Sequence, residues 1–329
     1  MNSSLTIPSK ANLMKHLTIL VCVSLLTLSN AIAQSYPNKT IRMVVGFVAG
    51  GPTDAIARVY AQRLSNVVGQ QVVIENKGGA DGVIAADIVA KSAPDGYTLF
   101  FISAGHAINA SFYPKVPYRT VEDFAPVILV GESPNIIAVT SSLPVNTLRE
   151  FIALAKSKPN ALNYGATSSP TLLATELFNS LAGIQIMRIP FKGAAPAMAA
   201  VMSGDVQLVI SGIGTTLPQV KGGNLKGLAV TGAKRSPLAP EIPTVVESGI
   251  NFIATTWYGL IAPAGTPTNI IQRLNTASRK LLEDPEFKAQ VAPQGVVLNP
   301  STPEEFGTFL RSEVALWSKV VKDTGVKAE

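Results

Sequence analysis

The sequence predicts an α/β fold of two lobes, with two chain segments crossing between them. Strands and helices alternate through residues 34–140, and a polar or glycine-rich loop follows each strand. A second block repeats the unit of strand, small loop and helix three times, and the last block returns to helices that need a sheet to cover. Crossings near Pro134 and Trp257 would follow. We therefore expect lobe 1 to hold residues 34–134 and 258–329, lobe 2 to hold residues 135–257, and a ligand cleft between them.

The first 33 residues differ from the rest of the chain. Lys10 and Lys15 precede an apolar run at residues 17–28, and small residues follow at positions 31 and 33. This pattern predicts a secretory signal peptide over residues 1–33, cleaved between Ala33 and Gln34. An uncleaved membrane anchor is the alternative, although the apolar run is short for crossing a bilayer. Lipidation at Cys22 is a weaker alternative, because that residue lies inside the apolar run and follows a bulky valine.

The composition argues against several classes of function. Loss of residues 1–33 would remove two lysines and no acids, so the net charge of +6 would fall to +4. No basic run or basic-aromatic interleaving is present, and we therefore expect no nucleic-acid partner. The mature chain would contain no cysteine and one histidine, His106. Disulfides, a cysteine nucleophile and a multi-histidine zinc site are thereby excluded, and we expect no cofactor or metal.

A glycine loop separates the first predicted strand from the first predicted helix. The strand covers residues 41–47, the turn Gly-Gly-Pro occupies residues 50–52, and apolar residues recur at helical spacing over 56–67. If Thr53 or Asp54 begins the helix, free N–H groups and the positive end of the helix dipole converge on one spot. A carboxylate would fit there. A simple βα turn with an N-cap is the alternative interpretation.

Further loops of the same kind follow later strands. In lobe 1 a strand at residues 71–75 leads into a glycine loop at 76–82, and a strand at 97–103 leads to Ser103 and His106. Three polar loops would then share one sheet edge, because ligands gather at the carboxyl ends of parallel strands. In lobe 2 the expected strands cover residues 136–140, 162–165, 185–189 and 206–210.

Helix starts are marked by polar caps. Thr147 and Glu150 form the pattern of a capping box, as do Thr302 and Glu305. Thr266 precedes Pro267 in the order expected for N-cap and N1 of a helix that ends near residue 283. The last helix carries one apolar face, made of Phe306, Phe309, Leu310, Val314, Trp317 and Val321.

The mature chain resembles the Bug-type extracytoplasmic solute receptors of the tripartite tricarboxylate transporter family. Many spaced motifs match in order, each loop lying at the end of a predicted strand. The matching motifs are residues 36–39 (Tyr-Pro-Asn-Lys), 49–54 (Ala-Gly-Gly-Pro-Thr-Asp), 75–82 (Glu-Asn-Lys-Gly-Gly-Ala-Asp-Gly), 94–99 (Pro-Asp-Gly-Tyr-Thr-Leu), 190–193 (Pro-Phe-Lys-Gly), 228–231 (Leu-Ala-Val-Thr), 243–249 (Pro-Thr-Val-Val-Glu-Ser-Gly) and 262–267 (Ala-Pro-Ala-Gly-Thr-Pro).

The resemblance implies a two-lobe periplasmic-binding-protein fold of the Venus-flytrap type that closes on a small carboxylate in the periplasm. It implies membrane permease subunits as partners, and we expect a monomer. Loops of lobe 1 would grip one carboxylate through backbone groups and water, and loops of lobe 2 would set the rest of the specificity. Carried onto this chain, the expected ligand-binding residues are Phe47, Ala49, Gly50, Gly51, Pro52, Thr53, Asp54, Ser103, His106, Thr167, Ser168, Ser169, Phe191, Lys192, Gly193, Ala194 and Ser211.

Two positions depart from the pattern of the family. Leu172 stands where relatives commonly carry a histidine, and Ser211 stands where many carry an aspartate. Because little would then pair with an ammonium group, the sequence favours a carboxylate with a neutral body, aromatic or aliphatic.

Several expected ligand residues have ordinary structural alternatives. His106 could cap a loop or face solvent instead of a carboxylate. Asp54 would repel a carboxylate, so an N-cap or a partnership with Arg58 is the better interpretation of its side chain. Lys192 could be a solvated charge, with the N–H groups of Gly193 and Ala194 as better donors. Short hydroxyl side chains such as Ser103 could cap local backbone.

An enzyme and a sensor are the competing classes of function. No Gly-x-Ser-x-Gly elbow, phosphate-binding loop or dinucleotide fingerprint occurs, so we expect no catalysis, although a carboxylate dyad remains open. A receptor of the same fold could instead report its ligand to a membrane sensor kinase.

Overall fold

The computed structural model describes residues 36–326 and 328, except for positions 167 and 192. The predicted signal peptide and its cleavage site lie outside the described residues, as do Thr167 and Lys192. Residues 39–329 form one structural unit. Within its described residues, no helix is both long enough and apolar enough to span a membrane.

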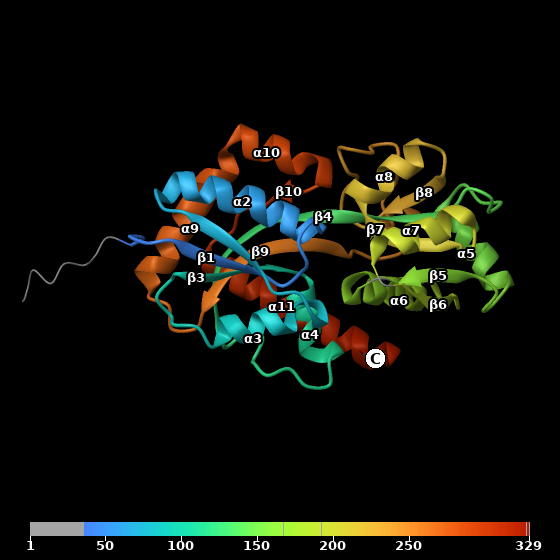
Figure 1. Cartoon of the computed structure of the whole chain (residues 1–329). Helices are drawn as coiled ribbons and strands as arrows, with labels where there is room; N and C mark the ends of the chain where they lie inside the picture. Colours follow the sequence, from blue (N-terminus) through green and yellow to red (C-terminus); the bar gives the residue numbers. More distant parts are fainter. Residues whose placement is uncertain (1–35, 167, 192, 327, 329) are drawn as a thin grey trace, which may run out of the picture. The chain divides into compact units, whose positions relative to one another are not determined.

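The strands of this unit join in the order β2-β1-β3-β9-β4-β7-β5-β6, with β8 and β10 also paired to β4 (Figure 1). In order along the chain they are β1 (Ile41–Val45), β2 (Val72–Asn76), β3 (Thr98–Ser103), β4 (Phe124–Thr140), β5 (Asn163–Ala166), β6 (Met187–Pro190), β7 (Leu208–Gly212), β8 (Leu225–Val230), β9 (Thr255–Pro263) and β10 (Val297–Leu298).

Helices cover both faces of the sheet. Figure 1 shows α2, α9 and α10 on one side of β1 and β3, and α3, α4 and α11 on the other. The α-helices are α2 (Pro52–Val68), α3 (Val83–Ala90), α4 (Gly105–Phe112), α5 (Leu148–Ser157), α6 (Ser169–Ala182), α7 (Ala194–Ser203), α8 (Ile213–Lys221), α9 (Thr268–Glu283), α10 (Pro285–Val291) and α11 (Pro303–Thr324). Short 3₁₀ helices are η1 (Ala80–Gly82), η2 (Val246–Ser248) and η3 (Ala292–Gln294).

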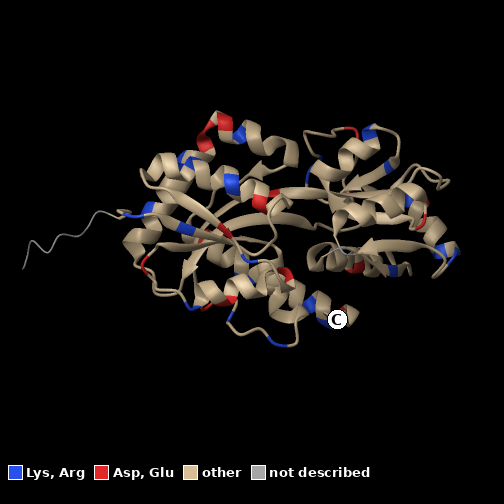
Figure 2. Cartoon of the chain, viewed as in Figure 1, with Lys and Arg blue, Asp and Glu red and all other residues tan. Residues whose placement is uncertain are grey.

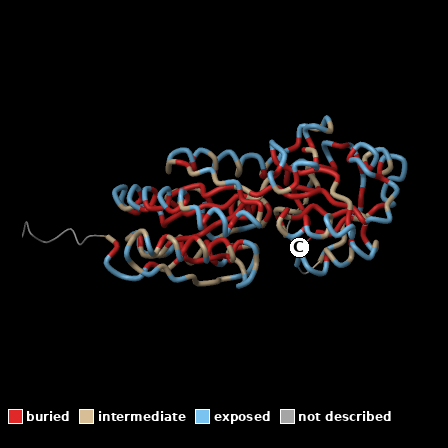
Figure 3. The backbone as a smooth tube through the Cα atoms, turned by 90° about the horizontal axis from the view of Figure 1, so that it is seen from above, coloured by how far each residue is buried: buried red, intermediate tan, exposed pale blue. Residues whose placement is uncertain are grey.

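Two half-sheets meet along β4. The first half-sheet contains β1, β2 and β3 in parallel, followed by β9 and the first part of β4 in antiparallel pairing. The second half-sheet contains the last part of β4, antiparallel to β7 and β8, with β5 and β6 parallel to β7. Buried segments run through the interior of both half-sheets (Figure 3), whereas the edge strands β2 and β6 contain no buried residue. Parallel strands separated by helices confirm the α/β prediction.

The strand predicted at residues 136–140 is the last part of a much longer strand. β4 starts at Phe124 and continues through Pro134, which lies opposite Thr255 of β9. The sequence concealed this length because two prolines and three residues with polar side chains interrupt the apolar pattern between residues 124 and 136. Both half-sheets therefore share one continuous strand.

A buried hydrogen-bond network joins the chain segments where the half-sheets meet. Asn135 and Thr231 exchange two bonds of 2.9 Å, from Asn135 N to Thr231 Oγ1 and from Thr231 N to Asn135 O. The carbonyl of Ala254, just before β9, accepts from Thr231 Oγ1 at 2.7 Å and from Asn135 Nδ2 at 3.1 Å. All three residues are buried. The end of β8 and the start of β9 are thus fastened to β4.

The C-terminal helix α11 begins as the sequence predicts. The side chain of Thr302 accepts from Glu305 N, and the Glu305 side chain accepts from Thr302 N, which completes a capping box. Phe306 lies against Gly259 of β9, where a Cβ atom would be 2.2 Å from Phe306 Cζ. Close contact between helix and sheet at this point requires glycine. By contrast, α9 begins at Thr268 with Pro267 as its N-cap, one residue later than predicted.

Candidate functional site

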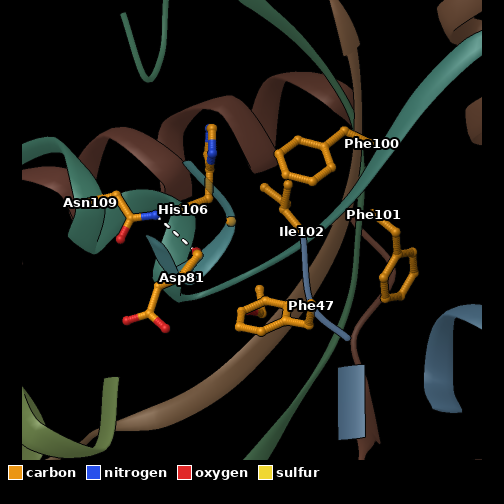
Figure 4. A pocket seen from close by; sticks show the side chains of 9 residues that line it. Phe47, Asp81, Phe100, Phe101, Ile102, His106 and Asn109 are labelled. Carbon is orange, nitrogen blue, oxygen red and sulfur yellow. Dashed lines mark hydrogen bonds between the residues drawn. The ribbon is translucent and has the colours of Figure 1, made fainter. Parts of the chain in front are cut away.

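A pocket lies at the carboxyl ends of β1 and β3 in the first half-sheet (Figure 4). The volume of about 210 Å³ that protein atoms leave unfilled there includes space open to solvent. Its lining comes from Phe47, two residues after β1, and from η1, β3 and α4. The lining residues are Phe47, Asp81, Gly82, Phe100, Phe101, Ile102, Ser103, His106 and Asn109. Its place at the strand ends is where open α/β sheets bind ligands.

The glycine loop after β1 is held to the end of β2 by Asp54. This buried carboxylate accepts from Gly50 N, Arg58 Nε and Asn76 Nδ2, each at 2.8 Å. The same Asn76 nitrogen also bonds to the carbonyl of Phe47 at 3.0 Å. Burial alone would raise the pKa of Asp54, but these hydrogen bonds and the Arg58 charge hold it below its usual value. Asp54 therefore shapes the loop, and its partnership with Arg58 is confirmed.

The helix after this loop begins at Pro52, not at Thr53 or Asp54. Gly51 is the N-cap in extended conformation, and no side chain caps the helix there. Pro52 at the first position has no N–H to lose. The N–H groups of Thr53 and Asp54 therefore belong to the first turn, where an intrahelical partner is absent by geometry. Ala49, Gly50 and Pro52 are exposed, and Gly51 is half-buried.

His106 lies on helix α4, where the sequence analysis expected a loop. Its Nε2–H donates to the carbonyl of Thr120 at 3.0 Å, and its ring stacks on Tyr118 with an angle of 7° between the planes. Burial lowers the pKa of His106 to about 4, although the bond to Thr120 opposes this shift. The imidazole is therefore neutral at pH 7. Its edge lines the pocket without a positive charge.

Asp81 is the one acidic residue that lines the pocket, and the sequence analysis did not select it. It has left-handed backbone angles, φ 49° and ψ 34°, and its carbonyl accepts from Asn109 Nδ2 at 3.0 Å. Its carboxylate accepts from Ser169 N of α6 at 3.0 Å, although the two residues are 88 positions apart. The signal for Asp81 in the sequence was its place inside the second glycine loop, between Gly79 and Gly82.

The second half-sheet presents its expected residues at the starts of two helices. Ser168 is the N-cap of α6, but its Oγ lies 3.2 Å from Thr171 Oγ1 and caps no backbone N–H. Ser169 is buried, and its Oγ has no hydrogen-bond partner among the described residues. Gly193 and Ala194 are exposed at the start of α7, next to the half-buried Phe191.

The structure brings some of the predicted ligand residues together and leaves others apart. Phe47, Ser103 and His106 line one pocket, and Ser169 reaches it through its bond to Asp81. Ser211 is buried in β7 opposite Ile136, outside this lining. The other described residues of the predicted set also lie outside the lining: Ala49, Gly50, Gly51, Pro52, Thr53, Asp54, Ser168, Phe191, Gly193 and Ala194.

Backbone N–H groups, not positively charged side chains, are the hydrogen-bond donors that this region offers to a small anion. Lys, Arg, Asp and Glu are interspersed along the chain, as Figure 2 shows. Across residues 36–326, apart from the two masked positions, no three His, Cys, Asp or Glu side chains are grouped to hold a metal ion. Backbone N–H groups at the starts of α2 and α7 are the available anion donors, because Asp81 already accepts from Ser169 N at the start of α6.

Comparison with known proteins gives the same picture over most of the chain. Residues 56–326 match the model of the tripartite tricarboxylate transporter family receptor. Protein BugT of Bordetella pertussis is 37% identical over 300 residues, covering 90% of this chain and 92% of BugT. An R. palustris protein with adipate is 36% identical, with a TM-score of 0.80 over 89% of this chain and 99% of that one. MatC from Rhodopseudomonas palustris with bound malate is 31% identical, with a TM-score of 0.76 over 87% of this chain and all of MatC.

These matches confirm the α/β periplasmic-binding-protein fold and a non-enzymatic receptor. The sequence identities of 36–37% are high enough to indicate shared family membership as well as a shared fold, and the matched regions cover both half-sheets. The chain belongs to the tripartite tricarboxylate transporter family of solute receptors, the Bug-type receptors.

Proposed function

We propose that this protein is a periplasmic receptor that captures a small carboxylate between two lobes and delivers it to the permease subunits of a tripartite tricarboxylate-type transporter. Lobe 1 contains residues 34–134 and 258–329, and lobe 2 contains residues 135–257. The observation that carries the proposal is the bond between Asp81 and Ser169, which brings the pocket of the first half-sheet to the start of α6 in the second. Adipate and malate in two solved relatives support a carboxylate ligand.

The two lobes would divide the recognition of the ligand. The N–H groups in the first turn of α2, beside Phe47, offer generic anion recognition through backbone. The polar side chains Ser103 and Ser169 and the apolar ring of Phe47 would set orientation and fit. The ligand residues proposed for lobe 2 remain Thr167, Ser168, Phe191, Lys192, Gly193, Ala194 and Ser211, of which Thr167 and Lys192 lie outside the described residues.

A thermal-shift screen of the mature protein tests this function. The screen compares mono-, di- and tricarboxylates, aromatic acids and neutral sugars. A ligand present at about 100 times its dissociation constant should add about 2.7 kcal/mol to the free energy of unfolding. Stabilisation by sugars or cations alone, with no carboxylate active, would contradict the proposal.

A glycine variant links the binding to the loop after β1. Gly51→Val should abolish binding, because the new side chain would occupy the approach to the first turn of α2. The fold should persist, since Gly51 is extended and a Cβ atom there would meet only Val48 O at 3.6 Å. Unchanged affinity in a folded Gly51→Val protein would remove the loop from the site.

The remaining steps concern export and delivery. Mass measurement of the protein recovered from the periplasm should give a mature chain that begins at Gln34. Deletion of the permease genes should abolish uptake of the ligand without changing its affinity for the receptor. Uptake that continues unchanged, together with loss of a transcriptional response when a sensor kinase is deleted, would favour the sensing alternative.

A further inference from the structure

The backbone of Asp81 is fixed in an uncommon conformation that aims its carboxylate. Ala80 and Asp81 both have positive φ, 46° and 49°, which costs free energy for residues other than glycine. The Asp81 carbonyl is held by Asn109, a buried residue of α4. Figure 4 shows the carboxylate pointing away from Asn109, from His106 and from the ring of Phe47. The fold thus maintains one orientation of this acid.

The Asp81 carboxylate takes the position of an anion at the start of α6. Its Oδ2 accepts from Ser169 N, the first residue of this 14-residue helix. The helix has no side-chain cap of its own, because the N-cap residue Ser168 turns toward Thr171. Asp81 therefore supplies the negative charge that favours a helix N-terminus. Beside it, the buried hydroxyl of Ser169 has no partner among the described residues.

We propose that Asp81 is a specificity-determining residue that excludes a second carboxylate and selects a ligand with one carboxylate and a hydrogen-bond donor, preferably an ammonium group, at its other end. A dicarboxylate held by the first turn of α2 would bring its far carboxylate toward a charge of the same sign. An ammonium group would instead meet Asp81 and the free Ser169 hydroxyl. This inference rests on the proposed function and narrows its substrate class.

The inference revises one expectation from the sequence. A neutral-bodied ligand was favoured because Leu172 and Ser211 remove an imidazole and an acid from the expected wall. Leu172 is indeed buried in α6, away from any polar role. Asp81 supplies an acid from the opposite half-sheet, and so a partner for an ammonium group is present after all.

Matched ligand series test the inference by calorimetry at pH 7. One series is succinate, 4-aminobutanoate and butanoate, and a longer one is adipate, 6-aminohexanoate and hexanoate. At whichever length binds, the amino acid should bind at least tenfold more tightly than the dicarboxylate. Asp81→Asn should reverse this order, because it removes the charge while asparagine still tolerates left-handed angles and still accepts from Ser169 N.

Control variants separate a local effect from a general one. Asp205→Asn makes the same change of charge at an exposed residue that accepts a hydrogen bond from Ser203 and does not line the pocket, so it should leave all affinities unchanged. Asp81→Gly provides a second variant that fits the backbone, and circular dichroism verifies folding of each protein.

The outcomes distinguish the two proposals. If wild type binds the dicarboxylate as tightly as the amino acid and Asp81→Asn changes neither affinity, the role of Asp81 is overturned while the receptor function stands. If no carboxylate of either series or of the wider screen binds, both proposals fall. A reversal of order in Asp81→Asn but not in Asp205→Asn supports the role.

Discussion

Asp54 and Asn76, 22 residues apart in the sequence, are joined by a hydrogen bond of 2.8 Å between Oδ1 and Nδ2. The bond crosses from the first turn of α2 to the end of β2. Because Asp54 also accepts from Gly50 N and Arg58, one buried carboxylate sets the path of the loop that precedes the proposed anion donors.

Asp54→Ala should lower both stability and ligand affinity. It removes the acceptor of Gly50 N–H and Arg58 Nε and one of the two acceptors of Asn76 Nδ2, at a cost of about 1–3 kcal/mol in unfolding free energy. Since the native pKa of Asp54 lies below its ordinary value, its contribution is present at neutral pH and is lost on acidification. Urea unfolding should therefore show that the free energy of unfolding decreases less between pH 7 and pH 3.5 in the variant than in wild type.

A surface pair provides the control for Asp54. Asp323 pairs with Lys319 at the same spacing of four residues, but both side chains are exposed. Asp323→Ala should cost at most about 0.5 kcal/mol. If the two variants lost equal amounts of unfolding free energy, the burial of Asp54 and its hydrogen bonds to the loop would contribute nothing to stability.

His106 should make the protein less stable below pH 6.5. Its pKa in the folded state is about 4, against 6.5 as the ordinary value, so the unfolded chain binds more protons between these values. Lowering the pH from 7 to 5 should cost about 2 kcal/mol of unfolding free energy through this residue. The mature chain has no other histidine if cleavage occurs after Ala33, which makes the effect separable.

The comparison for His106 is its glutamine variant. His106→Gln keeps a donor for the Thr120 carbonyl and cannot titrate. Its unfolding free energy should change less between pH 7 and pH 5 than that of wild type, whatever the stability at pH 7. Parallel pH profiles for the two proteins would refute the assignment.

Glu313 should give a pH effect of the opposite sign. Its Oε2 accepts from both indoles, Trp257 Nε1 at 2.7 Å and Trp317 Nε1 at 3.0 Å. Burial raises the pKa of Glu313 above its usual 4.5, despite the two bonds. Between the ordinary pKa and the raised pKa of the folded state, the folded protein binds more protons than the unfolded chain. The contribution of Glu313 to the free energy of unfolding therefore falls as the pH rises through this range.

Tryptophan emission can follow this titration directly. Trp257 and Trp317 are the two tryptophans of the chain, and both contact Glu313. The emission of the native protein should change with a midpoint above pH 4.5, and Glu313→Gln should remove that change. An identical titration in the variant would show that another group is responsible.

Gly259→Ala should destabilise the contact between α11 and the sheet. The added Cβ would lie 2.2 Å from Phe306 Cζ, and such overpacking costs about 1–3 kcal/mol. Phe306→Leu in the same protein should recover part of the loss, which a double-mutant cycle measures. Gly212→Ala is the control, since its Cβ would meet nothing within 4 Å. Additive effects of the two changes would argue against the clash.

The sequence predicted the regular part of the fold because local signals there agree with tertiary structure. Apolar strands, glycine loops and helical spacing of apolar residues gave β1, α2, β2 and β3 within a few residues. The capping box of α11 was fully predictable from Thr302 and Glu305, because both partners lie within one turn. These elements depend little on distant contacts.

What the sequence missed depends on residues far apart in the chain. β4 extends through Pro134 because β9 pairs alongside it, and the sequence of β4 alone did not indicate this. Helix α4 carries His106 and Asn109 although it begins with glycine and has no side-chain cap. Asp81 joins the site only through Ser169, 88 residues away, so no local spacing marks it. The left-handed angles at Ala80 and Asp81 likewise required the folded chain.

The continuous pairing of β4 with β9 has a mechanical consequence for a receptor that closes. Glu132 lies opposite Trp257 and Pro134 opposite Thr255, so the two crossing strands are bonded to each other where the half-sheets meet. Neither strand can bend alone without breaking this pairing. A change of angle between the half-sheets must therefore twist both strands together. The free energy of this deformation is spread over many residues. The free energy of ligand binding would then include the free energy needed to twist β4 and β9 on closure.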